Sequence, residues 1–178
     1  MSDMKLRKLR ADDAPLMLEW MHDDSVTHDL QTDFASKTLD DALTFINNSL
    51  TDEENLNLAI VDDNDEYMGT VSLKHIHEGK AEFGITVRRC AMGKGYSSFG
   101  MEEILQYGFR NIKLNYVYWC VDPVNARALR FYDKHGYLRI SHDEIAETVT
   151  RLGSYDSEEI KQYVWYITTD NNGKTMHE

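Results

Sequence analysis

Three strand-like segments follow one another in the middle of the chain, separated only by short turns, and this feature limits the possible folds most. Residues 56–61, 66–76 and 81–87 are rich in β-branched, aliphatic and aromatic side chains. The turns between them carry Asp, Asn and Gly, which favour tight reversals of the backbone. Connections this short join antiparallel neighbours, because a parallel pair needs a crossover of a dozen or more residues. The segment therefore predicts an antiparallel meander.

Before the meander, the pattern predicts one strand and two helices. Residues 5–9 alternate between polar and apolar, as a half-buried strand does. Asp12 is placed to cap a first helix. Thr38 caps a second helix, and Asp41 stands three residues later, where it completes a capping box. The polar stretch 22–36 lacks a period and indicates a loop or short helical turns.

After the meander, helices and strands alternate. Apolar residues recur at helical spacing over 101–112, and Asn125 is placed to cap another helix that ends near Gly136. The remaining strands are expected at residues 116–121, 137–140 and 162–168. The order predicts an α/β (α+β) fold, in which a mixed, mostly antiparallel sheet of about seven strands is flanked by helices. It differs from the regular alternation of a dinucleotide-binding fold.

Length and composition further limit the domain organisation and the cellular compartment of the protein. We expect one domain over 1–178, with a frayed polar tail at 170–178. No apolar run approaches the roughly 20 residues that cross a bilayer, and the first ten residues lack the apolar core of a signal peptide. Two cysteines, Cys90 and Cys120, form no disulfide framework or metal-ligand spacing, so the cytoplasm is the expected compartment.

A net charge of −12 bears mainly on partners. Such a surface repels phosphate backbones and anionic lipids, so we expect neither nucleic acid nor membrane as a partner. It would attract a cationic amine, although acidic surface also serves solubility. The oligomeric state stays open, a homodimer included.

A glycine-bearing turn leads into the helix that follows the meander. It consists of Met92, Gly93, Lys94, Gly95, Tyr96 and Ser97. Glycines there let several backbone N–H groups point at one spot, next to the positive end of the helix dipole, and this arrangement suits a pyrophosphate. An ordinary structural turn is the alternative interpretation. The spacing matches neither a Walker loop nor the dinucleotide fingerprint.

A second pattern surrounds the helix that Asn125 caps. Ala128, Phe131 and Tyr132 share its inner face, where Ala128 leaves room for a close approach and Tyr132 presents a phenol. Both aromatic residues could instead belong to the core.

These two segments, in this order, resemble the GNAT acetyltransferases, in particular the RimJ/RimL-like and polyamine acetyltransferase branch. The second segment matches the pattern Asn-x-x-Ala-x-x-Phe-Tyr-x-x-x-Gly-Tyr at every named position from Asn125 to Tyr137. The first departs from the family pattern in two places, because Met92 replaces Arg or Gln and Ser97 replaces Gly or Ala. Arg88 or Arg89 could supply the missing charge.

The resemblance implies that the chain is an enzyme that uses acetyl-CoA as co-substrate and needs no metal. It implies that the pantetheine arm lies between strands 81–87 and 116–122, and that the Val87 N–H polarises the thioester carbonyl. The implied contacts to acetyl-CoA are Ile85, Thr86, Val87, Met92, Gly93, Lys94, Gly95, Tyr96, Ser97, Asn125, Ala128 and Tyr132.

Two side chains are candidates for proton transfer. Glu82 lies where many members of the family carry an acid, and it would take a proton from the ammonium group of the acceptor. A solvated strand carboxylate is the alternative. Tyr132 would protonate the leaving thiolate. His75 and His77 share one strand face, but no third ligand accompanies them, so a structural or surface role is favoured over a metal site.

The expected activity is transfer of an acetyl group from acetyl-CoA to a primary amine of a small molecule, such as a polyamine or an aminosugar, by direct attack in a ternary complex. Acetylation of a protein N-terminus or lysine is an alternative. A non-catalytic module that binds acetyl-CoA is another, against which Tyr132 and Glu82 argue.

Overall fold

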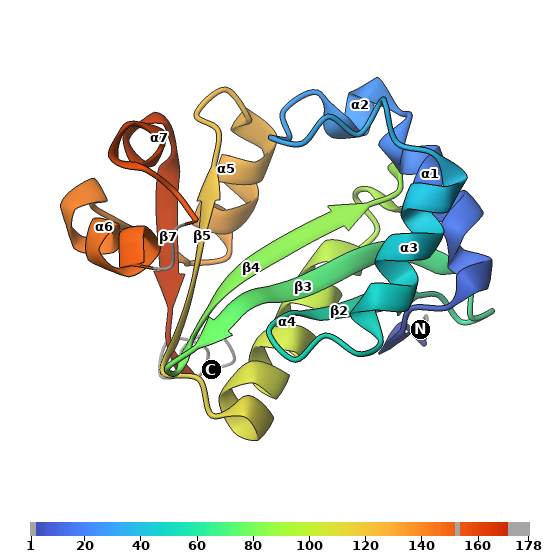
Figure 1. The fold of residues 1–178 in the computed structure, drawn as a ribbon, viewed down its shortest axis with the longest axis horizontal. Helices are drawn as coiled ribbons and strands as arrows, with labels where there is room; N and C mark the ends of the chain where they lie inside the picture. The colour runs from blue at the N-terminus through green and yellow to red at the C-terminus, as the bar shows by residue number, and fades with distance from the viewer. Residues whose placement is uncertain (1–2, 152–153, 171–178) are drawn as a thin grey trace.

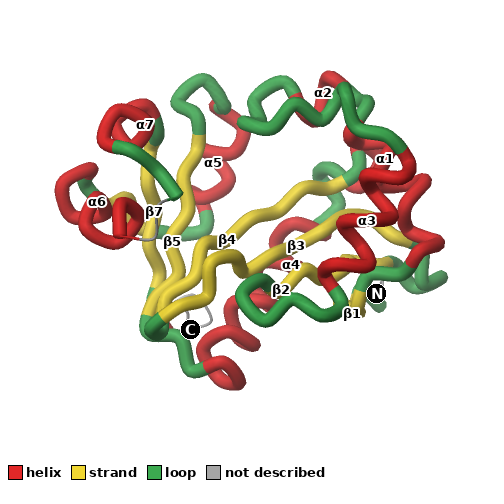
Figure 2. The backbone as a smooth tube through the Cα atoms, viewed as in Figure 1, coloured by secondary structure: helices red, strands yellow, loops and turns green. Residues whose placement is uncertain are grey.

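The protein is described from a computed structural model that covers residues 3–151 and 154–170, and the expected frayed tail lies outside this part from residue 171 onward. Seven strands form one sheet in the order β1-β2-β3-β4-β5-β7-β6 (Figures 1 and 2). All neighbours are antiparallel except β4 and β5, which confirms the predicted mixed sheet. The strands are β1 (Lys5–Lys8), β2 (Leu56–Val61), β3 (Tyr67–His77), β4 (Lys80–Val87), β5 (Tyr116–Val121), β6 (Leu138–Ile140) and β7 (Val164–Thr168).

The N-terminal helices cover one face of β1–β4. They are α1 (Ala14–Met21), the short α2 (Asp24–Thr27) and α3 (Leu39–Ser49). The predicted capping box at the start of α3 is confirmed, with the Asp41 N–H donating to Thr38 Oγ1 at 3.2 Å. The predicted cap at Asp12 is wrong, because a 3-10 turn over Ala11–Asp13 precedes α1. The Asp13 carboxylate instead accepts the Arg10 N–H and pairs with Arg7.

Helix α4 (Tyr96–Tyr107) covers the opposite face of β1–β4 and lies behind the sheet in Figure 1. Its Gly100 packs so closely on Ile60 of β2 that a Cβ there would overlap the isoleucine side chain. A π-helical turn over Gly108–Ile112 continues α4 before the chain enters β5. This close packing fixes the N-terminus of α4 beside the end of β4.

The C-terminal part of the sheet carries α5 (Ala126–Lys134) on one face and α6 (His142–Arg151) and α7 (Ser157–Gln162) on the other. Helices α6 and α7 follow β6 and precede β7 in the chain, where the sequence pattern predicted no helix. Ile145 and Val149 of α6 and Ile160 of α7 are buried against Tyr118 and Trp165. The two helices therefore cover a sheet face that would otherwise expose two large aromatic side chains.

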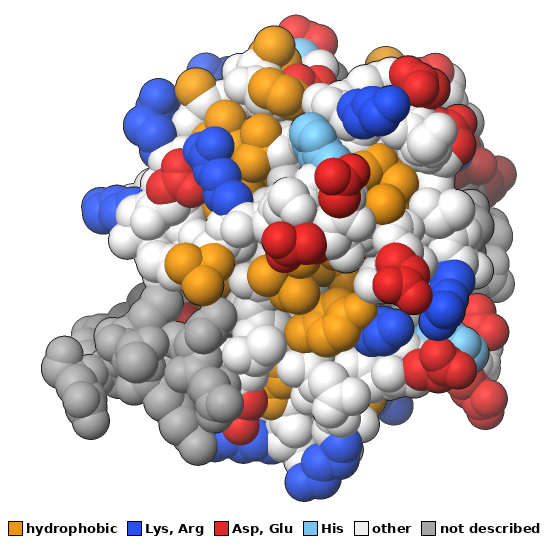
Figure 3. Space-filling view, turned by 90° about the vertical axis from the view of Figure 1, so that its left-hand side faces the viewer, with side chains coloured by type: hydrophobic (Ala, Val, Ile, Leu, Met, Phe, Trp, Pro, Cys, Tyr) orange, Lys and Arg blue, Asp and Glu red, His pale blue; other side chains and the backbone are white. Residues whose placement is uncertain are grey.

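The surface over α6 and α7 mixes acidic, basic and hydrophobic side chains (Figure 3). The excess of acidic residues is thus not gathered into one uniform field on this face. Within the described ranges, no helix combines the length and the apolar character that crossing a bilayer requires.

Candidate active site

The two parallel strands separate partway along their length. β4 and β5 pair at Lys80↔Tyr116, Ala81↔Val117 and Glu82↔Tyr118, and the pairing stops there although both strands continue. Beyond this point the strands diverge, as Figure 1 shows. A cavity of about 860 Å³ lies along the divergence, lined by residues of β4, β5, α5 and the glycine turn. Residues 83–87 therefore pair with β3 on one edge and border an opening on the edge that faces β5.

The glycine turn forms one end of this cavity. Gly93 and Gly95 have φ angles of 74° and 90°, a region that favours glycine. Gly95 is the N-cap of α4 and offers no side chain to the first N–H groups of that helix. These N–H groups are the ones that bind anions at helix N-termini. The turn thus has the backbone geometry that the predicted phosphate site requires, and phosphate binding there stays a prediction.

The side chains of this turn do not all face the cavity. Met92, Gly93, Gly95 and Ser97 line it. Lys94 is exposed and does not line it, and the Tyr96 side chain is 9 % exposed and packs in the core. The role expected of these last two residues is therefore limited to their backbone and, for Lys94, to its charge at a distance.

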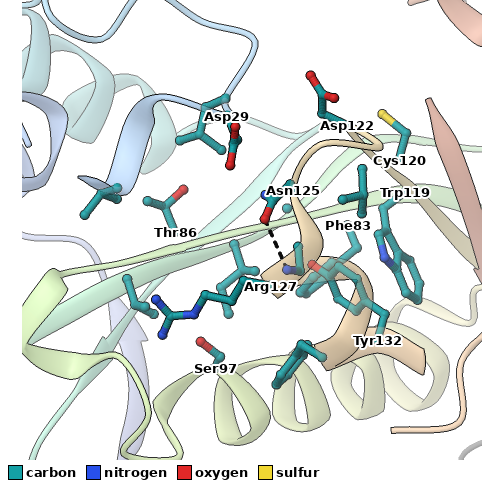
Figure 4. A pocket seen from close by; sticks show the side chains of 18 of the residues that line it. Asp29, Phe83, Thr86, Ser97, Trp119, Cys120, Asp122, Asn125, Arg127 and Tyr132 are labelled. Carbon is teal, nitrogen blue, oxygen red and sulfur yellow. Dashed lines mark hydrogen bonds between the residues drawn. The ribbon is translucent and has the colours of Figure 1, made fainter. Parts of the chain in front are cut away.

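A cation that the sequence analysis did not single out lies beside the turn. Arg127, in the first turn of α5, lines the cavity, and its Nη1 donates to Met92 Sδ at 2.8 Å (Figure 4). Arg88 is engaged elsewhere, because it is 8 % exposed and pairs with Glu19 at 2.9 Å and Glu66 at 2.7 Å. Arg88 therefore supplies no charge to the cavity, and the cation that lines it beside the turn is Arg127 of α5. The signal in the sequence was a basic residue two positions after a helix cap, within the matched motif.

Tyr132 enters the cavity from α5. Its ring is 8 % exposed and lies 5.2 Å, between centroids, from both Trp119 and Tyr166. Its side chain lines the cavity (Figure 4). Burial, and then the neighbouring Tyr137 and Tyr166, raise the pKa of the Tyr132 phenol. The hydroxyl therefore stays protonated at neutral pH and is available as a proton donor.

Asn125 and Ala128 connect the start of α5 to the same cavity. Asn125 Oδ1 accepts a hydrogen bond from the Ala128 N–H at 3.1 Å, which confirms the predicted cap, and both residues line the cavity. The cap engages the amide oxygen, and this leaves the Asn125 NH₂ group to donate to a ligand.

Glu82 lies where the two strands begin to diverge. Its side chain is only 5 % exposed, and the Tyr155 hydroxyl donates to its Oε1 at 2.7 Å. Lys74 Nζ lies 4.0 Å from the same oxygen. Burial, and then the charge of Glu82, raise the pKa of Tyr155, so this phenol remains a donor to the carboxylate. The alternative interpretation of Glu82, as a solvated strand carboxylate, is therefore wrong.

Tyr155 was missed because no helix was predicted between β6 and β7. It lies between α6 and α7, and its ring packs edge-on against Trp165 at 5.0 Å between centroids. Nothing in the local sequence pattern indicates that the Tyr155 hydroxyl contacts Glu82 of β4.

The loop after α2 covers the cavity from the N-terminal side. Gln31 Nε2 donates to Cys120 Sγ of β5 at 3.5 Å, which links the loop to the far strand. Asp29 and Asp122 stand on the same rim (Figure 4). The backbone carbonyl of Asp24, and then the Asp29 carboxylate, raise the pKa of His28. The rim therefore carries two carboxylates, and the buried Glu82 lines the same cavity.

A second hollow of about 530 Å³ adjoins the first under α3. Both are lined by Thr32, Phe34, Lys74, Gly84, Ile85 and Thr86. The site thus has two arms, one toward the glycine turn and one between α3 and the sheet.

Comparisons with known proteins agree with this arrangement. The family described as Acetyltransferase (GNAT) domain matches residues 3–138. An uncharacterized N-acetyltransferase, p20 of Bacillus licheniformis, is 30% identical over 148 residues, which are 76% of this chain and 82% of that protein. The chain belongs to the GNAT family and is an acetyl-CoA-dependent N-acetyltransferase.

Solved structures share the fold at low sequence identity. Spermidine N-acetyltransferase of Vibrio cholerae, in complex with CoA and spermine, superposes with a TM-score of 0.76 at 19% identity, covering 96% of this chain and 98% of that one. FdhC, a nucleotide-linked sugar GNAT, gives a TM-score of 0.72 at 18% identity, covering 97% of this chain and 89% of that one. At these identities the likeness establishes the fold alone.

Of the predicted site residues, eleven side chains or backbone positions meet in the one cavity. They are Glu82, Ile85, Thr86, Val87, Met92, Gly93, Gly95, Ser97, Asn125, Ala128 and Tyr132.

Proposed function

We propose that the chain, as one catalytic domain, transfers the acetyl group of acetyl-CoA to a primary amine of a small molecule by direct attack, with both substrates bound together. One observation carries the proposal. The divergence of β4 and β5 beyond Glu82 opens a cavity that reaches both the glycine turn and Tyr132. An extended thioester can therefore run from a phosphate site to a phenol.

The backbone of β4 supports a position for the thioester carbonyl. The Arg88 N–H donates to the Met68 carbonyl of β3 at 2.8 Å. Because successive N–H groups of a strand point to opposite sides, the Val87 N–H faces away from β3, toward the opening. A single N–H there would stabilise the oxyanion as the amine attacks.

The two candidate side chains suit opposite proton transfers. An aliphatic amine is mostly protonated at neutral pH and must lose a proton before it attacks. Glu82 is a carboxylate at the branch of the two strands and would accept that proton. Tyr132 retains its proton because of burial and would deliver it to the leaving thiolate of CoA.

The glycine turn and α5 would both bind the pyrophosphate of CoA. The turn offers backbone N–H groups, and Arg127 adds a guanidinium beside Met92. Arg127 would thus supply the phosphate contact that, in the family pattern, the Arg or Gln at the position of Met92 would make.

A small acceptor fits the site better than a peptide. The contact between Gln31 and Cys120 bridges the cavity on one side, which narrows the space available to an extended peptide. Asp29 and Asp122 on the rim would attract an ammonium group. The neighbours named above include an enzyme of a polyamine, which carries primary amines, and one of a nucleotide-linked sugar. The free thiols Cys90 and Cys120 suit a reducing cytoplasm.

The test is release of free CoA thiol from acetyl-CoA with a panel of polyamines, aminosugars and lysine-containing peptides. We expect turnover with at least one small amine. In Glu82→Gln the turnover rate should fall by about a hundredfold or more, within the usual range of general base catalysis. Turnover of peptides alone would support protein acetylation instead. CoA binding without turnover of any amine would support a non-catalytic module.

A further inference from the structure

An irregularity in β3 turns two consecutive side chains toward the same carboxylate. The register with β4 shifts between Lys74 and His77, and His75 has a φ of 53°. In a regular strand, neighbouring residues point to opposite faces of the sheet. Here the positive φ of His75 breaks that alternation, as β-bulges do near functional sites.

The bulge is held by the segment before β2. The His75 N–H donates to Asn55 Oδ1 at 3.0 Å, and the Ile76 N–H donates to the Glu54 carbonyl at 2.8 Å. The backbone donors that the bulge removes from the ladder are therefore satisfied, and the conformation of His75 is fixed on both sides.

The consequence is a contact between His75 and Glu82. His75 Nε2 lies 3.7 Å from Glu82 Oε2, while Tyr155 occupies the other carboxylate oxygen. This separation is longer than a hydrogen bond, and catalytic hydrogen bonds are often long before substrate binds and tighten afterwards. The Glu82 side chain is 5 % exposed and that of His75 is 45 % exposed. His75 therefore connects a buried carboxylate to solvent.

The other groups around Glu82 are poor proton acceptors. Burial raises the pKa values of Tyr155 and of Tyr118, and it raises that of Cys120 to about 11. Lys74 carries an ammonium group, which has no free lone pair while it is charged. Among the described residues that face Glu82, His75 is thus the one that offers an imidazole, which in its neutral form has a ring nitrogen that can accept a proton.

We propose that His75 is the proton exit of the site: the imidazole takes from Glu82 the proton that Glu82 removes from the acceptor ammonium, and releases it to water. This inference rests on the proposed role of Glu82 as base. The balance is simple, because acetylation of an ammonium group by acetyl-CoA gives an amide, CoA thiol and one proton. The N–H bond of the ammonium breaks, the proton passes to a Glu82 oxygen, then to His75 Nε2, and leaves from the exposed ring.

His75 acts here as a positioning and relay residue, since it reaches the acceptor only through Glu82. A purely structural role, as a residue that tolerates the bulge, is the competing explanation. Asparagine tolerates a positive φ and is too short to reach Glu82, so His75→Asn separates the two explanations. His77→Asn is the matched control, because His77 lies on the same strand and pairs with the exposed Glu78 at 3.6 Å instead.

The experiment measures steady-state acetylation of the best amine by the wild-type chain and both variants, with imidazole added at constant pH and ionic strength. We expect His75→Asn to lower kcat about tenfold, the lower part of the range for one proton-transfer group, with the KM for acetyl-CoA and the thermal midpoint unchanged. Added imidazole should restore the rate of His75→Asn in proportion to its concentration. The wild type and His77→Asn should not respond.

Three results would overturn the relay. They are an undiminished kcat in His75→Asn, a loss that imidazole does not restore, and an equal loss in His77→Asn. Each leaves the proposed function intact as long as the wild type acetylates an amine and Glu82→Gln is impaired. A wild-type chain that acetylates no amine would overturn the proposed function and the relay together.

Discussion

The Tyr155 hydroxyl donates to Glu82 Oε1 at 2.7 Å and thereby joins the segment between α6 and α7 to the branch point of the sheet. This hydrogen bond crosses 73 positions in the sequence. It links the C-terminal helices, which the family match over residues 3–138 does not include, to the candidate base.

Removing this hydrogen bond should affect both stability and rate. Tyr155→Phe leaves a buried carboxylate without its donor, and hydrogen bonds to charged groups contribute about 2 kcal/mol. We expect a loss of that order in the free energy of unfolding, measured by denaturant titration, together with a lower kcat. Tyr163→Phe is the control, because Tyr163 packs 6.3 Å from Tyr155 between ring centroids. Equal effects of both substitutions would argue against a special role for Tyr155.

Tyr132→Phe tests the proposed acid. The substitution keeps the ring and its packing on Trp119 but removes the proton donor. We expect kcat to fall about a hundredfold, with CoA affinity nearly unchanged in a calorimetric titration. Tyr137→Phe, whose ring lies 6.3 Å from Tyr132, should retain activity. A fully active Tyr132→Phe variant would require another source for the thiolate proton.

Arg127→Ala tests the proposed phosphate contact. The guanidinium borders the glycine turn, so its loss should raise the KM for acetyl-CoA about fivefold, which corresponds to roughly 1 kcal/mol. The difference from wild type should shrink as salt is added, because salt screens the interaction between the charges. Arg130→Ala, on the same helix but outside the cavity lining, serves as control. An unchanged KM in Arg127→Ala would assign the phosphate to the backbone alone.

Asp65 makes the N-terminal strand sensitive to acid. Hydrogen bonds from Arg10 and then Arg7 lower the pKa of Asp65 to about 2. A depressed carboxylate pKa stabilises the fold above the pKa of the unfolded chain, about 3.9, and this stabilisation is lost as the pH falls toward 2. The thermal midpoint of Asp65→Asn should therefore lie below that of wild type at pH 7, and the two should converge near pH 2. Asp63→Asn, in the same turn, should follow the wild type; a gap for Asp65→Asn that persists at pH 2 would contradict the assignment.

Much of the fold could be predicted because its signals are local. The capping box of Thr38 and Asp41, the cap at Asn125 and the meander each depend on residues close in sequence, and the structure contains all of them. Helices α6 and α7 were missed because they are short and polar on most of their surface. Their few apolar residues gain stability by packing on Tyr118 and Trp165, which lie outside both helices in the chain.

The surroundings of Glu82 could not be predicted because they depend on exceptions to local rules. Strand alternation places Lys74 and His75 on opposite faces, whereas the bulge brings both to one carboxylate. Tyr155 reaches the same carboxylate from a segment with no assigned structure in the sequence analysis. Arg88 was a candidate for the charge beside the glycine turn, because the sequence pattern could not show that it forms ion pairs with Glu19 and Glu66.

The most direct test of the central claim is a calorimetric titration of the wild-type chain with CoA and, separately, with pantetheine. We expect saturable binding of CoA, and much weaker binding of pantetheine, which lacks the pyrophosphate that the glycine turn and Arg127 would hold. Absence of CoA binding, or equal affinity for the two compounds, would contradict it.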